Sequence, residues 1–482
     1  MDTDVIIVGA GPTGMMLANE LRVAGVAAVL ADKLPRRSEL SRAGGVQSRT
    51  QEAFDQRGLL EPLLATGTYP AGTAHFAGIT LPLTHDRHRQ PWRSIPQVNI
   101  EAFFERHLAA YGIHVRRDHE LTGLTQDDDG VTATFGGGAR IRARYVVGAD
   151  GAHSTVRSLL RADFPGRSAS ATLVAADVRL RGTDKVDTHT WAEDGHWAAL
   201  FPLGTDTQGR PMHRLALGGP QHSLPRETPV TEDEVRTGIR TVFGPHRVEL
   251  LELCYGRRIT NSARQAADYR HGRVFLSGDA AHIHLPVGAQ GMNTGIQDAL
   301  NLGWKLGAAI HGWAPDGLLD TYHAERHPIG AAVLRNVQTQ GLLMDLDGSR
   351  SPDIVATKEL FTALAQLPEV QFHLDDMLSG MGFRYALPGA EHQPLVGLPA
   401  PDVDLGSARS HELLRSGHGL LLDPSGEFSE VAALWSDRVN HAGKAAATEP
   451  MLIRPDGYVC WAGDPTVLES ALHHWFGKPA QR

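Results

Sequence analysis

The sequence predicts an α/β protein in which a Rossmann-like dinucleotide-binding domain is interleaved with an α+β domain and followed by a smaller C-terminal domain. Three observations favour this architecture. A G-x-G-x-x-G stretch follows an apolar run near the N-terminus, short alternating runs fill residues 74–100 and 172–268, and the pattern changes again at about residue 396. At 482 residues the chain is longer than one hydrophobic core usually serves, so two or three domains are expected.

Composition and charge exclude several classes of protein. The formal net charge of −9 comes from mixed-sign surfaces without a long basic run, which argues against a nucleic-acid partner. The two cysteines, Cys254 and Cys460, are too few for a disulfide framework or a tetrahedral zinc site, and they suit a reducing cytoplasm. No segment is long and apolar enough to cross a membrane, and the N-terminus lacks the basic start of a signal peptide. We therefore expect a cytoplasmic protein without a membrane partner.

The first motif, DVIIVGAGPTGMMLANELRVAGVAAVLAD, is predicted to form a strand, a turn, a helix and a second strand. The apolar run Val5–Val8 is typical of a strand buried on both faces, and the helix is expected over Met15–Val23. Gly25 ends that helix, and Ala27–Ala31 forms the second strand. Asp32 follows, at the position where an acid can bond a ribose hydroxyl.

The three glycines of this motif have different predicted roles. Gly9 allows the tight turn, Gly11 lets a pyrophosphate approach the backbone, and Gly14 lets the helix pack closely on the strand. The helix N-terminus adds only about 0.3–1 kcal/mol of attraction for an anion, so most of the phosphate binding must come from direct N–H donors. The motif predicts a dinucleotide without specifying which one.

Two more glycine-bearing turns follow apolar strands. Three short strands separated by turns at residues 127–130 and 136–138 are expected before Gly148, and the last of them runs into Asp150-Gly151. The run VFLSGDAAHIHLPVGAQGMN ends a buried strand at Gly278-Asp279 and continues in backbone rich in glycine and proline. A single acid at the end of a buried strand must be solvated by a ligand or by nearby backbone amides.

The remaining segments divide into alternating strands, long helices and a C-terminal tail. Residues 172–268 predict antiparallel strands that wall a pocket, interrupted by a helix that starts at a Thr231–Glu234 capping box. Helices are expected over 293–343 with a break at 312–317. In the tail, strands are predicted over Gly419–Leu422, Met451–Ile453 and Tyr458–Trp461.

The chain resembles the flavin-dependent aromatic hydroxylases, the single-component p-hydroxybenzoate hydroxylase-like monooxygenases, in the three motifs GAGPTG with Asp32, GADGAHSTVR and VFLSGDAAHIHLPVGAQGMN. The resemblance covers almost the whole chain and is greatest to the actinomycete branch that acts on aromatic polyketides, which includes rifampicin monooxygenases. It implies an FAD-binding domain (1–73, 101–171 and 269–395), a substrate-binding middle domain (74–100 and 172–268) and a thioredoxin-like C-terminal domain (396–482) that lacks a C-x-x-C motif.

The resemblance also implies which residues bind FAD. Asp279 is expected to accept a ribityl hydroxyl, and Asp150-Gly151 matches a motif shared by FAD and NAD(P)H. Arg42 and Gln97 match residues near the flavin in relatives, while Asp32 replaces the usual glutamate and therefore has a shorter reach. The residues expected to bind the cofactor are Gly9, Gly11, Pro12, Thr13, Gly14, Asp32, Lys33, Arg42, Gln97, Asp150, Gly151, Gly278, Asp279, Pro286, Gly288, Gly291, Met292 and Asn293.

The implied reaction is a monooxygenation of a polycyclic aromatic, polyketide-type substrate. NADPH would reduce FAD transiently from a cleft, and O₂ would form a flavin C4a-hydroperoxide that transfers one oxygen atom. A base would help a phenolic substrate, but the sequence identifies no catalytic residue; His75 and His213 lie in the pocket-forming segments. Rifamycin-type antibiotic inactivation, Baeyer–Villiger oxygenation and a flavin-holding module without turnover remain alternatives. The sequence does not determine the oligomeric state, and a homodimer is one alternative.

Two histidine pairs resemble metal ligands by residue type. His282 and His284 have no third ligand nearby in the sequence, which favours structural packing. His323 and His327 are one helical turn apart, but Glu325 does not follow the first histidine as H-E-x-x-H requires. A salt-bridged helix start is favoured there, and we expect no metal site.

Overall fold

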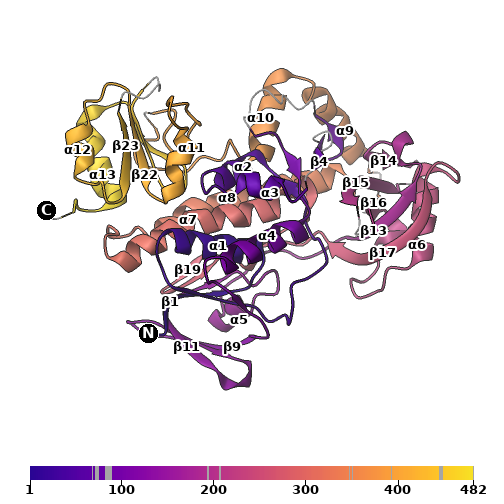
Figure 1. Ribbon diagram of the computed structural model, residues 1–482. Helices are drawn as coiled ribbons and strands as arrows, with labels where there is room; N and C mark the ends of the chain where they lie inside the picture. The colour runs from indigo at the N-terminus through magenta and orange to yellow at the C-terminus, as the bar shows by residue number, and fades with distance from the viewer. Residues whose placement is uncertain are drawn as a thin grey trace.

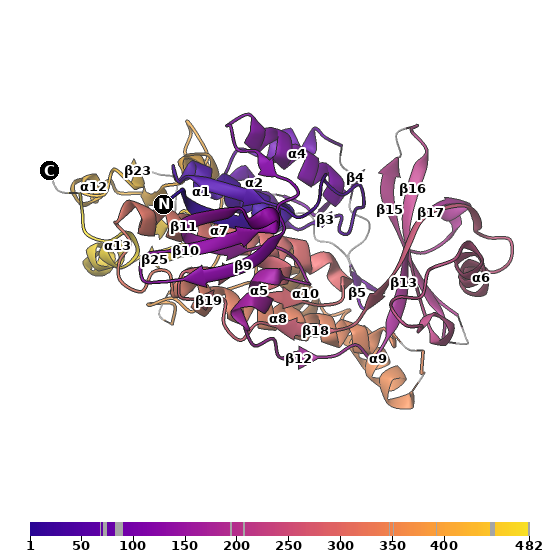
Figure 2. The same ribbon diagram turned by 90° about the horizontal axis from the view of Figure 1, so that it is seen from below.

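The fold consists of a large mixed sheet with its helices, a five-stranded sheet at one end and a four-stranded sheet at the other (Figure 1). The middle sheet stays at the same end when the molecule is seen from below (Figure 2). The predicted middle-domain segment 74–100 is described only in part. The computed structural model describes residues 1–67, 69–70, 75–81, 90–192, 195–205, 208–346, 348–349, 351–391, 393–443 and 449–480.

The large sheet has a parallel centre formed by the strands that precede the three glycine-bearing turns. Its order is β19-β20-β11-β1-β2-β8, and β10 and β9 continue from β11 as an antiparallel meander. In the parallel register Val8 pairs with Gly148, and Gly148 pairs with Leu276, so β1, β11 and β20 end side by side. The strands are β1 (Thr3–Val8), β2 (Ala28–Ala31), β8 (Val115–Arg116), β9 (Leu121–Gln126), β10 (Val131–Phe135), β11 (Arg140–Gly148), β19 (Arg270–His271) and β20 (Val274–Leu276).

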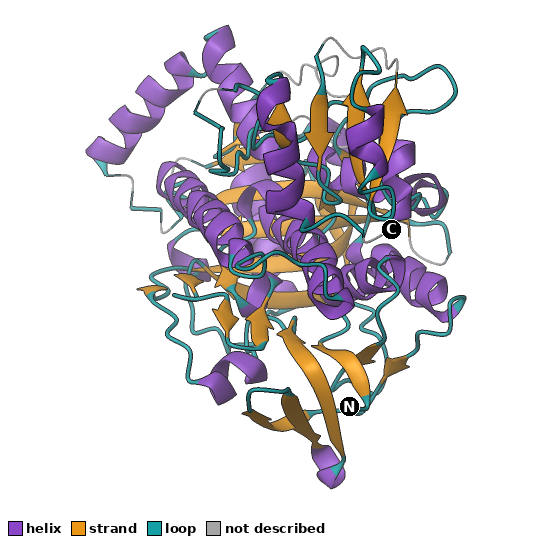
Figure 3. Ribbon diagram, turned by 90° about the vertical axis from the view of Figure 1, so that its left-hand side faces the viewer, coloured by secondary structure: helices purple, strands orange, loops and turns teal. Residues whose placement is uncertain are grey.

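The helices of this part form a layer across the molecule, with the meander strands near the N-terminus (Figure 3). The first helix begins earlier than the sequence predicted, at Pro12, because proline suits the first helical position. The expected break after residue 311 is confirmed, with Gly312 in the left-handed conformation at the end of α7. The helices are α1 (Pro12–Val23), α2 (Ser48–Asp55), α3 (Leu60–Leu64), α4 (Gln97–Ala109), α5 (Thr155–Leu160), α7 (Gln290–His311), α8 (Thr321–Leu343), α9 (Pro352–Leu364) and α10 (Pro368–Ser379).

Short strands form three further small sheets. A three-stranded sheet has the order β3-β7-β4, another has the order β12-β18-β21, and β5 pairs with β6 as a hairpin. These strands are β3 (Gly45–Val46), β4 (Tyr69–Pro70), β5 (His75–Phe76), β6 (Ile79–Thr80), β7 (Arg93–Ser94), β12 (Gly166–Arg167), β18 (Ala263–Gln265) and β21 (His282–Ile283).

The middle sheet is antiparallel, in the order β14-β15-β16-β13-β17, and one of its faces packs on α6. Only one of the two hydrogen bonds of the predicted capping box forms. Thr231 accepts a hydrogen bond from the Glu234 backbone N–H, but the Glu234 carboxylate binds Arg258 and His222 instead of returning to Thr231. The elements are β13 (Thr172–Arg181), β14 (His189–Trp191), β15 (Trp197–Thr205), β16 (Pro211–Gly218), β17 (Glu249–Thr260) and α6 (Glu232–Phe243).

The C-terminal sheet contains the three strands predicted in the tail and one more. Its order is β23-β22-β24-β25; β22 and β23 are parallel, while β24 is antiparallel to both its neighbours. Cys460 is buried in this sheet, whereas Cys254 is exposed on the middle sheet. The elements are β22 (Gly419–Asp423), β23 (Val439–Gly443), β24 (Met451–Ile453), β25 (Val459–Ala462), α11 (Ser410–Leu413), α12 (Ser429–Ala433) and α13 (Leu468–Phe476).

Across the described residues, no helix combines the length and the apolar character needed to cross a membrane.

Candidate functional site

The three glycine-bearing turns meet at one edge of the large sheet. A Cβ atom on Gly9 would lie 2.3 Å from the carbonyl oxygen of Ala149, so the first turn lies directly against the second. The side chain of Thr13 fills the space between the third turn and α7, where a Cβ on Gly278 would lie 2.7 Å and one on Gly295 2.4 Å from its Oγ1. The sequence motifs therefore form one site, and the glycines allow backbone contacts that side chains would prevent.

Open space begins at the second glycine of the first motif. A Cβ on Gly11 would meet no atom within 4 Å. Gly11 is also the N-cap of α1, whose first turn has no side-chain cap and no acidic residue. Thr13 offers only its backbone N–H here, because its side chain is packed behind the turn. Free N–H groups at a helix N-terminus, with room in front of them, fit a pyrophosphate.

Asp32 stabilises the first turn through both of its carboxylate oxygens. Its Oδ2 accepts a hydrogen bond from the Ala10 backbone N–H (2.8 Å), and its Oδ1 accepts one from Leu34 (2.8 Å). The guanidinium of Arg117 lies 3.7 Å from Oδ1. A carboxylate has about four acceptor positions, so a ribose hydroxyl can still be accommodated. The neighbouring Lys33 is exposed.

Asp150 holds the second turn and retains one unsatisfied oxygen. Its Oδ2 accepts hydrogen bonds from the backbone N–H groups of Thr155 (2.7 Å) and Val156 (3.1 Å). Its Oδ1 is buried and has no partner among the described residues. Burial raises the pKa of Asp150, with hydrogen bonds opposing that effect. A buried carboxylate oxygen without a partner is the feature that a ligand donor would satisfy.

Arg157 joins the second turn to the third. Its Nη1 donates to the carbonyl of Ala280 (2.8 Å) and its Nη2 to that of Ala152 (2.8 Å). Its guanidinium also lies 3.9 Å from the centre of the Phe164 ring. The side chain is therefore committed to holding the two turns together.

The third turn is anchored by Asp298, a residue that the sequence did not single out. This fully buried side chain on α7 accepts hydrogen bonds from the Gly278 backbone N–H (3.1 Å) and Nε2 of His282 (2.8 Å) through Oδ2, and from Nε of Arg326 (2.7 Å) through Oδ1. Burial would raise the pKa of Asp298, but Arg326 and His282 together hold it below its ordinary value. In the sequence Asp298 is one of several polar residues along this helix, so no local pattern distinguishes it.

This anchor leaves Asp279 facing outward. Asp279 is exposed between the buried residues Gly278 and Ala280, and its carboxylate accepts no hydrogen bond from the part of the chain that the structure describes. The carboxylate, just after β20, is therefore open to its surroundings, as acceptance of a ligand hydroxyl would require.

The segment after the third turn is fixed by Asn293. The Asn293 side chain accepts a hydrogen bond from the Gln47 backbone N–H (3.0 Å) and donates to the carbonyls of Gly45 (2.9 Å) and Ala289 (2.7 Å). It therefore holds the segment against β3 and leaves backbone, rather than the amide side chain, for a ligand. Of the other residues predicted there, Gly288 is buried, Gly291 and Met292 are half-buried, and Pro286 is exposed.

Arg42 lies in the loop before β3, and Gln97, the first residue of α4, contacts that loop. Arg42 is exposed, and the Gln97 amide donates to Glu101 on α4 (2.6 Å). The Gln97 backbone N–H donates to Oγ of Ser41 (2.8 Å), and Arg214 of the middle sheet donates to the Ser41 carbonyl. The loop thus connects the large sheet to the middle sheet.

The middle sheet turns an apolar face toward this loop. Its cross-strand pairs place Leu173, Ala175, Ala199, Phe201, Ala216 and Ile259 on one face, opposite the face that packs on α6. At one end of this face, Arg214 holds Asp177 with two hydrogen bonds.

The histidines proposed for the pocket lie in different places. His75 and His189 pack with ring centres 4.0 Å apart, beside Phe201. Burial lowers the pKa of His75 to about 4, and burial with His75 and Lys358 lowers that of His189 to about 3. His213 pairs with Val178, on the strand positions that face α6.

None of the histidine pairs weighed from the sequence forms a metal site among the described residues. Within the part of the chain that the structure describes, only Asp55, Asp402 and His411 bring three ligand atoms within 4.8 Å of one another. Arg409 donates hydrogen bonds to both carboxylates and supplies the positive charge there. The prediction of a salt-bridged helix start is confirmed by Glu325, which binds Lys305 (2.9 Å) and Arg454 (2.7 Å), although this network is buried.

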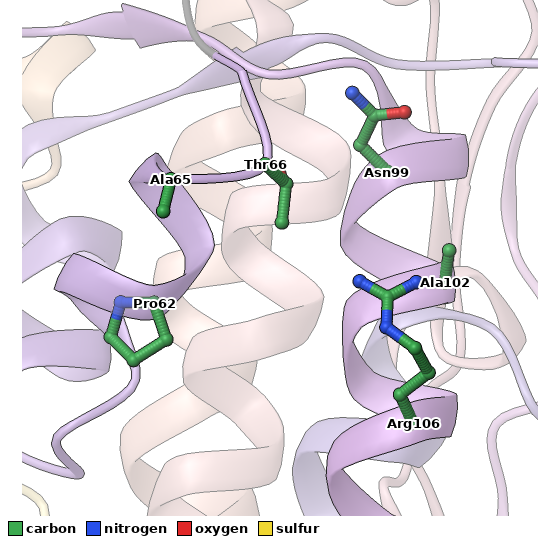
Figure 4. A pocket seen from close by; sticks show the side chains of 6 residues that line it. All are labelled: Pro62, Ala65, Thr66, Asn99, Ala102 and Arg106. Carbon is green, nitrogen blue, oxygen red and sulfur yellow. The ribbon is translucent and has the colours of Figure 1, made fainter.

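An open depression of about 430 Å³ lies between α3 and α4 (Figure 4). No residue predicted to bind the cofactor lines it, and Arg106 is its only charged side chain. We do not assign the site to this depression. Its lining residues are Pro62, Ala65, Thr66, Asn99, Ala102 and Arg106.

Comparison with known proteins decides the family. Residues 2–337 match the model described as an FAD binding domain, and residues 393–479 match the one described as the C-terminal part of aromatic-ring hydroxylases. The chain belongs to the aromatic-ring hydroxylases with an FAD-binding domain. It is a flavoprotein monooxygenase, as the resemblance implied, and its mixed α/β fold is that of the p-hydroxybenzoate hydroxylase-like enzymes.

Three relatives show the extent of this similarity. The 12-dehydrotetracycline 5-monooxygenase/anhydrotetracycline 6-monooxygenase of Streptomyces rimosus is 39% identical over 519 residues, with 100% of both chains covered. A rifampicin monooxygenase of Streptomyces venezuelae is 40% identical over 484 residues, with 98% of both chains covered. CabE, an aromatic hydroxylase from angucycline biosynthesis, has a solved structure with a TM-score of 0.87 and 36% identity, with 100% of both chains covered.

Proposed function

We propose that this monooxygenase hydroxylates a polycyclic aromatic, polyketide-type substrate, with NADPH as the transient reductant and O₂ as the oxidant. The observation that supports this best is the position of the middle sheet, whose apolar face is tied through Ser41 to the loop beside the three turns. The tetracycline-type relative and the angucycline hydroxylase act on the class of substrate that such a face suits.

The proposed FAD site uses the residues expected from the sequence, with three of them in altered roles. The N–H groups at the start of α1 would bind the pyrophosphate, Asp279 would accept a ribityl hydroxyl, and the backbone at 291–293 would line the pyrimidine edge. Asp32, Thr13 and Asn293 would act mainly by holding the turns in place. The orphaned Oδ1 of Asp150 and the space in front of Gly11 support this assignment.

When bound, FAD supplies the activation of O₂ and the transfer of one oxygen atom. The protein's own residues position the two reactants and exclude water. The apolar face orients the ring system, and burial of His75 and His189 keeps both imidazoles uncharged at neutral pH, so that either can accept a hydrogen bond from a phenol. No side chain in the described residues is assigned as a catalytic base.

We also propose the division into domains at the boundaries expected from the sequence, with a thioredoxin-like C-terminal domain. The order β22-α12-β23-β24-β25-α13, with β22 parallel to β23 and antiparallel to β24, supports the thioredoxin-like assignment. With one cysteine, which is buried, this domain would have no thiol chemistry.

The alternative within the same class is oxidation of a rifamycin-type antibiotic, including ring-opening Baeyer–Villiger chemistry. The relative that carries the name rifampicin monooxygenase favours it, because its similarity to this chain is as high as that of the tetracycline-type enzyme.

The test uses the purified chain loaded with FAD. We expect a yellow protein whose NADPH and O₂ consumption rises when polycyclic phenols or quinones are added, with a product one oxygen atom heavier. Determination of the product structure separates hydroxylation from ring opening. A yellow protein whose NADPH oxidation responds to no aromatic compound, including a rifamycin, would contradict the proposal and favour a flavin-holding module without turnover.

A further inference from the structure

Arg257 is a half-buried cation without an ion-pair partner. It lies on β17, where it pairs across the sheet with Ala175 of β13, so its side chain is on the face turned away from α6. Within the described chain, Arg257 forms no salt bridge and no hydrogen bond through its side chain. Charged side chains are rarely buried without a partner, because desolvation of the charge is costly.

The carboxylate near Arg257 is already engaged by another arginine. Tyr255 and Asp177 are cross-strand partners, and Asp177 is the only carboxylate on this part of the sheet face near Arg257 in the described structure. Both oxygens of Asp177 are already bonded by Arg214, to Nε (2.8 Å) and Nη2 (3.0 Å). Asp177 therefore neutralises Arg214 and leaves Arg257 uncompensated.

A third guanidinium approaches from the large sheet. Arg214 donates to the carbonyl of Ser41, and this contact brings Arg42 beside the sheet face. The charge of Arg42 also acts on Glu101 of α4. Burial raises the pKa of Glu101, and Arg42 opposes that rise. Burial together with Arg214 and Arg42 lowers the pKa of Arg257, although a guanidinium remains charged at any working pH. Arg257, Arg214 and Arg42 thus lie around one position on the sheet face, where the carboxylate of Asp177 is already bonded by Arg214.

This cationic end adjoins the apolar face described above. Ala175 and Ala216 lie beside Arg257 and Arg214 in the cross-strand pairing, and Phe201 pairs with Arg214. The chain that follows this loop reaches the segment after the third turn through the hydrogen bond between Asn293 and Gly45. A planar molecule on this face would therefore have its apolar rings on the sheet, one end near the turns and an acidic end at the arginines.

We propose that Arg257 binds an anionic oxygen of the substrate, a carboxylate, enolate or phenolate at one end of the ring system, and thereby determines which end is oxidised. This inference rests on the proposed function for the identity of the substrate. The other source of an anion is the 2′-phosphate of NADPH, which the experiment separates. The adjoining apolar surface favours the aromatic acid.

The experiment measures binding to the FAD-loaded enzyme with two probes, 4,5-dihydroxyanthraquinone-2-carboxylate and its methyl ester, which share the ring system but differ in the charge and in one methyl group. Titration is followed by flavin fluorescence, so turnover is not needed. We expect the wild-type enzyme to bind the acid about tenfold more tightly than the ester, since a charge-assisted hydrogen bond is lost in the ester. Arg257→Gln should abolish that preference, and Arg257→Lys should retain part of it.

A matched control separates this local effect from a change in overall charge. Arg181→Gln removes the same charge at the far end of β13, where Arg181 is exposed and pairs with Glu249. It should leave the acid-to-ester ratio unchanged. Equal binding of acid and ester by the wild-type enzyme, or a preference that survives in Arg257→Gln, would overturn the proposal.

A second measurement compares the KM values for NADPH and NADH in the wild-type enzyme and in Arg257→Gln. If Arg257 binds the substrate, Arg257→Gln should leave the ratio of the two KM values unchanged. A rise confined to NADPH would assign Arg257 to the 2′-phosphate and overturn the proposal. Failure of the proposed function has a different signature: the acid preference depends on Arg257, yet no aromatic compound stimulates NADPH oxidation.

Discussion

The charges behind the third turn and the charge of Arg257 on the middle sheet are arranged in opposite ways. Asp298 is fully buried and accepts hydrogen bonds from Gly278, His282 and Arg326. Arg257 is half-buried beside two other cations, and its side chain bonds none of the described residues. Complete pairing fixes the shape of a turn, whereas an unpaired charge facing an apolar surface marks a position for a ligand.

The largest expected effect comes from breaking the paired cluster. Asp298→Ala leaves Arg326 buried without its carboxylate, and loss of one partner of a buried ion pair costs about 3–5 kcal/mol. We expect the free energy of unfolding, measured by urea denaturation, to fall by that amount. Asp177→Ala should cost less, because the Arg214 side chain that it leaves without a partner is only half-buried. Equal losses in the two variants would contradict the contrast between the regions.

The second test concerns the contact between the first and third turns. Gly295→Ala places a Cβ 2.4 Å from Thr13 Oγ1, and such overpacking costs about 1–3 kcal/mol. Thr13→Ala removes the obstructing atom. The double variant should therefore recover most of the stability lost in Gly295→Ala, as measured by thermal unfolding. Additive losses in the double variant would show that these residues do not touch.

The third test changes ligand binding without changing the fold. Gly11→Ala adds a Cβ that meets no atom within 4 Å and sits on extended backbone that alanine can adopt. The apoprotein should melt at the wild-type temperature, while FAD binding should weaken by about tenfold, corresponding to about 1.4 kcal/mol. Gly14→Ala is the control, because its Cβ would lie 1.9 Å from the Gly9 carbonyl and should destabilise the fold itself.

The smallest effect is a difference in acid sensitivity. Arg326 and His282 lower the pKa of Asp298, so its stabilisation is present above about pH 3.8 and is lost as the pH falls through the lowered value. Burial raises the pKa of Asp177 despite Arg214, so protonation of Asp177 as the pH falls favours the folded state. In urea denaturation between pH 5 and pH 3, Asp298→Asn should flatten the loss of stability and Asp177→Asn should steepen it. The same slope in both variants would contradict these assignments.

The sequence predicted the parts of the site that are local in the chain. The G-x-G-x-x-G spacing located the first turn, and Gly-Asp after a buried strand located the third. It could not locate Asp298, because that role arises from packing between α7 and a turn 20 residues earlier. Nor could it place Arg257 beside Arg214, since their proximity depends on the register of β13 with β16 and β17. For the same reason the sequence did not predict the ion pair between Glu234 and Arg258.

We propose that the three turns at the ends of β1, β11 and β20 together hold one FAD molecule. A crystal structure of the FAD complex tests it most directly. We expect the pyrophosphate at the N–H groups that begin α1 and a ribityl hydroxyl within about 3 Å of the Asp279 carboxylate. An isoalloxazine bound elsewhere, with Asp279 still facing solvent, would contradict it.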